Sequence, residues 1–184
     1  MCYYITAVLP PETDPLAAQS IAEHYGRNLT PIENGGVQGQ LRSGELYCLT
    51  TAGHCDCDTT VGLLSRKRQP HQTQKDTRAR KLEALGWSKT KIERALSQSA
   101  QSQERNAARA AQSAAAETES WAKFIAAVHA AGIPYIGLLL HFYDGALSQS
   151  IQLKARVLVK SPSQATEVLP RIAEDTLYEF RTEA

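Results

Sequence analysis

The first element of the fold is Cys2-Tyr3-Tyr4-Ile5-Thr6-Ala7-Val8-Leu9, a stretch rich in aromatic and β-branched side chains. Such side chains pack well on the pleated surface of a sheet. Pro10-Pro11 follows directly, and proline cannot donate the backbone hydrogen bond that further strand pairing would need. The stretch therefore predicts a strand, and we place it in the interior of a sheet.

Further strands are expected on both sides of the middle of the chain. Residues 45–51 have the composition of a strand, as do residues 135–143 and 151–160. Asp144-Gly145, a typical turn pair, separates the last two, so we expect them to form an antiparallel hairpin. Weaker strand signals lie at residues 29–32 and 176–180, the latter being either a strand or the end of a helix.

Short helices are predicted near both ends of the chain. Asp14 can cap a helix that begins at Pro15 and ends at Tyr25 before Gly26. Ser161-Pro162 has the features of a second helix start, and we expect Pro170 to interrupt that helix. Residues 28–44 contain several glycines and are predicted to form mostly a loop.

The middle of the chain is predicted to be helical and poor in large apolar side chains. We expect one helix from Thr73 to Leu85 and a second from Ser88 to Ala131, with Gly86 between them. At 1.5 Å per residue the second helix would be about 60 Å long. Its centre, residues 97–120, is mainly alanine, glutamine, serine and charge, which favours helix but buries little. This section either packs closely through small side chains or forms an arm for a partner.

Length and composition favour one α+β domain over residues 1–184. We expect a mixed or antiparallel sheet with helices on one side and a long alanine-rich helical hairpin or arm, an excursion at about residues 73–131. The sequence has no run of about 18 apolar residues, so we expect no membrane span and a cytoplasmic location. Four cysteines are too few for a disulfide scaffold.

Charge is distributed unevenly along the chain. The whole chain has a formal net charge of +1, yet residues 66–94 hold ten basic side chains against three acidic ones. A basic segment of this kind can bind an acidic protein or nucleic acid, or simply be solvated. The basic residues that we take as candidates for partner binding are Arg66, Lys67, Arg68, Arg78, Lys89, Lys91 and Arg94.

The segment His54-Cys55-Asp56-Cys57 concentrates thiols, an imidazole and an acid. Together with Cys48 it could supply zinc with four ligands, namely Cys48, His54, Cys55 and Cys57. The usual zinc knuckle separates paired cysteines by two or more residues, and neighbouring acids raise the pKa of a thiol. We therefore favour unreactive, buried cysteines in a turn and expect no cofactor. A zinc-dependent or thiol-dependent enzyme or sensor is the alternative, and pairing of a thiol with His129 or His141 is a further one.

Common catalytic templates are missing from the sequence. It contains no Gly-x-x-x-x-Gly-Lys phosphate loop, no Gly-x-Ser-x-Gly elbow and no His-Glu-x-x-His motif. The cytidine-deaminase zinc motifs are also missing. A protein that is not an enzyme is therefore favoured.

Residues 84–96 resemble a helix-turn-helix, with Gly86 at the turn and basic side chains on the next helix. The predicted helix continues for about forty residues, which is unlike a recognition helix. We favour a helical hairpin with basic exposed faces, and DNA binding is the second alternative.

The stretch Met1 to Pro10, taken with Gly53-His54-Cys55-Asp56-Cys57, resembles a group of small uncharacterised bacterial proteins over about the first sixty residues. The resemblance implies a bacterial, cytosolic setting and is compatible with an accessory or immunity-type role, and it assigns no site residues. Our leading hypothesis is a non-enzymatic protein that binds a specific and acidic protein partner, such as a toxin or effector that it neutralises. The alanine-rich helix could also join two copies of the chain.

Overall fold

The computed structural model describes residues 2–61 and 81–182. The chain divides into two compact units, Met1–Arg66 with Ala116–Ala184, and Lys67–Ala115. The first unit contains the sheet and is called the sheet unit below. Most of the helix predicted from Thr73 to Leu85 lies outside the described residues. Its described part, residues 81–84, is helical. The assignment of residues 1–184 to a single domain stays a prediction.

The sheet unit has an α+β fold built on a mixed sheet, which confirms the predicted fold class. The described strands lie in the order β2-β3-β1-β4-β6-β5, so β1 is interior as expected. Neighbouring strands are antiparallel except β5 and β6, which run parallel. The strands are β1 (Cys2–Leu9), β2 (Thr30–Pro31), β3 (Leu46–Leu49), β4 (Tyr135–Tyr143), β5 (Ala155–Val159) and β6 (Thr176–Arg181).

The predicted hairpin between residues 135–143 and 151–160 is wrong. Strand β4 pairs with β1 and β6, whereas β5 pairs with β6 in the parallel direction. The connecting segment is held elsewhere: the Asn34 amide donates to the carbonyls of Leu147 and Gln149, both at 2.8 Å, and Gln40 donates to the Ile151 carbonyl at 2.6 Å. Because these bonds draw the segment away from β4, the C-terminal strand β6 occupies the place beside it.

The short helices follow local capping signals. Helix α1 (Pro15–His24) begins where the Asp14 carboxylate accepts the Leu16 amide at 3.0 Å, and it ends before Gly26, which has a φ of +66°. The stretch predicted as mostly loop contains one helical turn, α2 (Gly35–Gln38), because the Asn34 side chain accepts the Val37 amide at 3.0 Å. Near the C-terminus lie η1 (Pro162–Gln164), α6 (Ala165–Val168) and η2 (Leu169–Arg171), so the α-helix ends at Val168 and Pro170 lies within a 3-10 helix.

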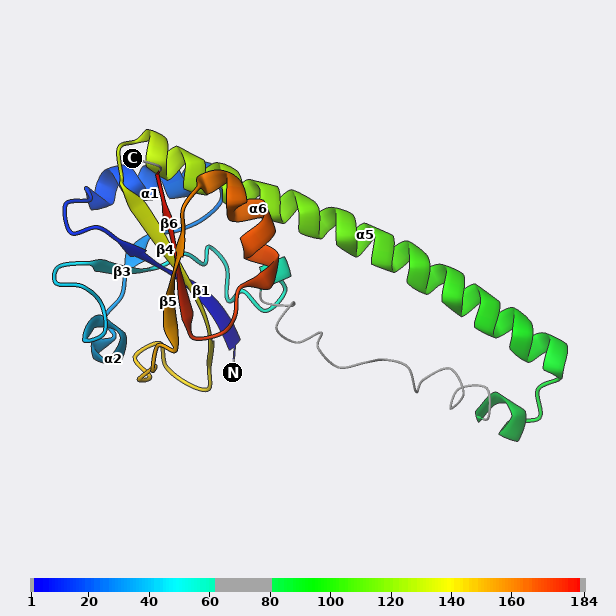
Figure 1. Cartoon of the computed structure of the whole chain (residues 1–184). Helices are drawn as coiled ribbons and strands as arrows, with labels where there is room; N and C mark the ends of the chain where they lie inside the picture. The colour runs from blue at the N-terminus through cyan, green and yellow to red at the C-terminus, as the bar shows by residue number, and fades with distance from the viewer. Residues whose placement is uncertain (1, 62–80, 183–184) are drawn as a thin grey trace. The chain divides into compact units, whose positions relative to one another are not determined.

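Two apolar clusters lie on opposite faces of the sheet. The larger one contains side chains of α1, α6 and the C-terminal part of α5 (Lys89–Ala130), which together cover one face (Figure 1). The smaller cluster lies under α2 and the segment after β4, and consists of Val8, Val37, Tyr47, Leu139, Tyr143, Ile151 and Leu177. Among the described residues, α1, α6 and the C-terminal part of α5 thus lie on one side of the sheet, as predicted for the helices, and the single turn α2 lies on the other.

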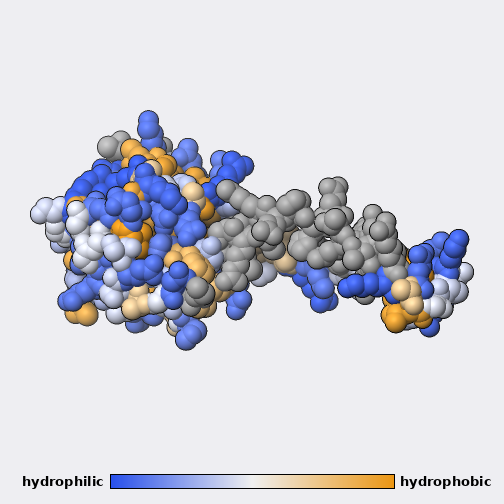
Figure 2. Space-filling view, turned by 90° about the horizontal axis from the view of Figure 1, so that it is seen from below, coloured by the Kyte–Doolittle hydropathy of each residue, from blue (hydrophilic) through white to orange (hydrophobic). Residues whose placement is uncertain are grey.

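The second unit is described from residue 81 to residue 115. Helix α5 begins at Lys89 and runs without interruption through the alanine-rich stretch, as the sequence predicted. Leu85, which precedes it, is 72% exposed, and Figure 2 shows hydrophobic surface in this part of the chain. Among the described residues, no helix combines the length and apolarity that crossing a membrane requires.

Candidate functional site

The cysteine-rich segment lies along one end of β1. Strand β3 pairs with β1 only from Thr6 to Leu9. Beyond that point the chain continues along the same edge: the Thr50 amide donates to the Ile5 carbonyl at 3.2 Å, and the Asp56 amide donates to the Tyr3 carbonyl at 2.8 Å. The segment between them contains bends and turns. Residues 55–57 are therefore held beside the first residues of the chain.

Asp56 anchors this segment from inside the protein. Its side chain is buried and accepts the Ile5 amide at 2.8 Å and the Thr51 hydroxyl. Burial raises the pKa of Asp56, and the hydrogen bonds from Thr51 and Ile5 only partly oppose that effect. The residue works as an acceptor that ties the segment to β1.

Three thiols meet next to this anchor. The Sγ atoms of Cys2, Cys55 and Cys57 all lie within 4.8 Å of one another. Cys57 is buried and its sulfur accepts the Tyr3 amide at 3.2 Å, whereas Cys2 and Cys55 are partly exposed. All four cysteines of the chain are thiols.

The predicted ligand set is assembled only in part. Cys55 and Cys57 come together, but Cys48 lies on β3 opposite Ala7, in the larger apolar cluster, and His54 is exposed. In the described part of the chain the group is completed by Cys2 instead. Sequence spacing does not reveal Cys2, because it is 53 positions before Cys55; only the pairing along β1 brings them together.

The thiol of Cys55 is not an activated nucleophile. The backbone amide of Cys57 lowers the pKa of Cys55. Burial, hydrogen bonds with the thiols of Cys57 and Cys2 and repulsion from Cys57 outweigh this effect and raise the pKa to about 11. Burial alone raises the pKa of Cys48 to about 11. Both groups are protonated at neutral pH, so a ligand that binds their sulfur atoms must displace protons.

The histidines considered as partners of a thiol have other neighbours. His129 Nδ1 lies 3.0 Å from the Ile133 carbonyl oxygen. His141 bonds to Asp175, beside Glu174, and Lys154 Nζ lies 2.7 Å from the second oxygen of Asp175. His141, Glu174 and Asp175 are a second group of potential metal ligands. Lys154 already compensates part of the negative charge of this group.

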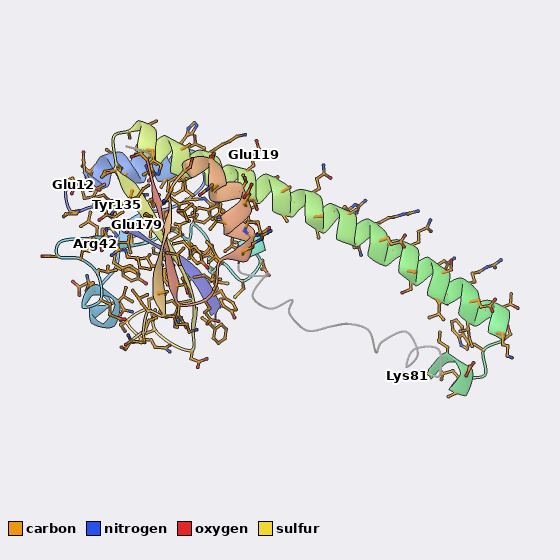
Figure 3. The ribbon with its side chains drawn as sticks, viewed as in Figure 1. Glu12, Arg42, Lys81, Glu119, Tyr135 and Glu179 are labelled. Carbon is orange, nitrogen blue, oxygen red and sulfur yellow. The ribbon has the colours of Figure 1, made fainter. Side chains whose placement is uncertain are left out.

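A charged cluster that sequence inspection missed lies on the face of the smaller apolar cluster. The carboxylates of Glu45 and Glu179 are buried, and Arg156 bridges them at 2.5 and 2.7 Å. The Tyr135 hydroxyl donates to Glu45 at 2.6 Å, and Arg42 lies 3.1 Å from Glu179 (Figure 3). Arg181 also pairs with Glu179. Both carboxylates are thus compensated by arginines. These contacts join β4, β5 and β6 to the segment before β3.

Only some of the predicted partner-binding residues can be placed. Lys89, Lys91 and Arg94 are exposed on the first turns of α5, and Lys91 Nζ lies 4.1 Å from the centre of the Trp87 ring. Trp87 thus contacts its own helix start. The other four candidates, Arg66, Lys67, Arg68 and Arg78, lie outside the described residues.

The described residues therefore hold one group of converging thiols, one compensated charged cluster and one exposed basic helix segment. The three thiols form a group of potential metal ligands. Comparisons of the chain with protein-family models, with curated proteins and with solved structures found no match.

Proposed function

We propose that this is a cytoplasmic, non-enzymatic protein that binds an acidic protein partner through residues 89–115 of α5. The observation that carries the proposal is burial: among the described side chains of that range, only Ile92 is buried. A helix segment that buries so little apolar surface against the described residues gains little stabilisation from them. Packing against a partner would supply the missing burial.

The charge of this segment favours an acidic partner. Residues 89–115 contain five basic and two acidic side chains, all exposed: Lys89, Lys91, Glu93, Arg94, Glu104, Arg105 and Arg109. Opposite charges accelerate association and disfavour wrong partners, and both effects weaken as salt rises. An acidic toxin or effector domain, neutralised by an immunity-type protein, fits this requirement.

The alanines of the segment suit contact with another helix. Alanine loses no side-chain entropy on burial, and small side chains let two helices approach closely. A second copy of this chain could pack against α5 in the same way. The test must therefore distinguish a different protein from a second copy of the chain.

A capture experiment with matched charge changes tests the proposal. Wild-type protein and the variant Arg105→Glu/Arg109→Glu serve as baits, and the captured partner is then purified and titrated by calorimetry. We expect a one-to-one complex whose Kd increases with salt and increases at least about tenfold in the variant. The control Lys160→Glu/Arg171→Glu makes the same change in net charge at exposed positions of the sheet unit and should bind like wild type.

Three outcomes would contradict the proposal. The first is equal binding by wild type and by the α5 variant. The second is a concentration-dependent dimer in light scattering that the α5 variant abolishes, which would make the partner a second copy. The third is salt-dependent binding of duplex DNA that Lys89→Glu/Lys91→Glu/Arg94→Glu abolishes, with no protein captured.

A further inference from the structure

We propose that Cys2, Cys55 and Cys57 form a zinc site with three protein thiolates and a fourth position for an exchangeable ligand. The proposal is independent of partner binding by α5. It rests on the convergence of three sulfur atoms from two segments that are more than fifty residues apart in the sequence.

The distances between the sulfur atoms are compatible with one bound ion. Zinc lies about 2.3 Å from a thiolate sulfur, so two sulfurs of a tetrahedral site are about 3.8 Å apart. The three Sγ atoms already lie within 4.8 Å of one another. Closing the site therefore requires shifts of about 1 Å or less between sulfurs, which small side-chain rotations can provide.

The local backbone explains why a Cys-x-Cys pair can serve here without the spacing of a zinc knuckle. The side chains of Cys55 and Cys57 both reach Cys2, while the side chain between them, Asp56, is turned to the Ile5 amide. Alternate residues of one segment thus supply two ligands. The third comes from the neighbouring strand, so no tight loop around the metal is needed.

The surroundings of the thiols also fit a metal thiolate. The Tyr3 amide donates to the Cys57 sulfur, and such a hydrogen bond stabilises negative charge on that atom. Cys57 is held inside, whereas Cys2 and Cys55 are partly exposed and give an ion a path to the site. Thiolates prefer zinc and softer ions to magnesium or calcium, which bind oxygen ligands.

Within the described part of the chain, the group has three protein ligands and leaves the fourth position of a tetrahedral ion open. Structural zinc usually has four protein ligands, and sites with three keep one position for water or substrate. The described residues supply three thiols to the group. Zn²⁺ replaces three thiol protons, which gives a centre of net charge −1, and a water or another small donor completes the tetrahedron.

Spectroscopy of the reduced, full-length chain tests the proposal. Co²⁺ serves as the probe, because tetrahedral cobalt thiolates absorb strongly, and Zn²⁺ then displaces it in competition with a chromophoric chelator. We expect one equivalent of metal and an intense thiolate-to-cobalt band. Cys2→Ser and Cys55→Ser should each reduce that band and weaken zinc binding at least about 100-fold. Mg²⁺ should not displace cobalt.

Cys48→Ser is the matched control, since it removes a thiol that lies outside the group. It should change zinc affinity less than about threefold. Circular dichroism without metal checks that each variant is folded, and the partly exposed Cys2 and Cys55 are chosen so that the variants keep the fold. Absence of the cobalt band in protein with all four thiols reduced would overturn the proposal. A loss of zinc affinity in Cys48→Ser or His54→Ala equal to the loss in Cys2→Ser would also overturn it.

Discussion

The two halves of helix α5 differ in what their side chains do, although they belong to one continuous helix. In the C-terminal half, Trp121, Phe124, Ile125 and Val128 are fully buried at helical spacing. Residues 89–115, the N-terminal part of the helix, carry mainly alanine, glutamine, serine and exposed charge. Helical structure alone therefore does not tell a buried element from an exposed one; the size of the side chains does.

The largest expected effect comes from removing an aromatic ring of the buried half. Phe124→Ala should lower the free energy of unfolding by about 3–5 kcal/mol, because it leaves a cavity in the larger apolar cluster. Urea denaturation measures this loss. Arg105→Ala, in the exposed half, is the control and should change stability by less than about 0.5 kcal/mol. Similar losses for the two variants would show that the halves are equally buried.

Acid should destabilise the sheet unit through its paired carboxylates. Burial raises the pKa of Asp175, but hydrogen bonds from Lys154 and His141 outweigh it and hold that pKa below its usual range. The pKa of Glu45 is lowered in the same way, chiefly by Arg156 and Tyr135 acting against burial. A carboxyl whose folded pKa is depressed stabilises the protein above its unfolded pKa, near 4, and loses that contribution as pH falls.

We therefore expect the free energy of unfolding to fall as pH drops below about 4, because these carboxyl groups then take up protons and lose their paired form. Asp175→Asn should make the pH dependence shallower, as measured by urea denaturation from pH 7 to pH 3. An equally steep decline in the variant would mean that Asp175 does not contribute to acid sensitivity.

The smallest effect is expected from one substitution made in both halves of the helix. Ala126 and Ala108 are both exposed, so replacing either with glycine tests helix propensity rather than packing. Ala126→Gly should reduce the global free energy of unfolding by about 1 kcal/mol, since that half is anchored to the core. Ala108→Gly should lower the helical dichroism signal and leave the urea midpoint of the sheet unit unchanged. If Ala108→Gly shifted that midpoint as much as Ala126→Gly, the two parts of α5 would not differ in how they are anchored to the core.

Much of the local structure was predictable because its causes are close together in sequence. The strand at residues 2–9 ends at its prolines, α1 is capped by Asp14 and ended by Gly26, and α5 runs through residues with high helix propensity. The one-turn helix α2 was missed, because its stability depends on the Asn34 side chain and not on composition.

The candidate site was predictable only in part. The unusual Cys55-Asp56-Cys57 segment is visible in the sequence, but Cys2 joins it through backbone pairing along β1. The Glu45 and Glu179 cluster has no local signature either, since Glu45 is more than one hundred residues from Arg156 and from Glu179.

The sequence by itself determined the interior strand, the capped helix α1, the long alanine-rich helix and the uneven charge, because each depends on neighbouring residues and their intrinsic preferences. Tertiary structure alone decided that β5 runs parallel to β6, that Cys2 and not Cys48 meets Cys55 and Cys57, and that two buried glutamates share one arginine. The physical reason is that strand partners and buried charge pairs are selected by competition among distant segments for the same sheet edges and hydrogen bonds.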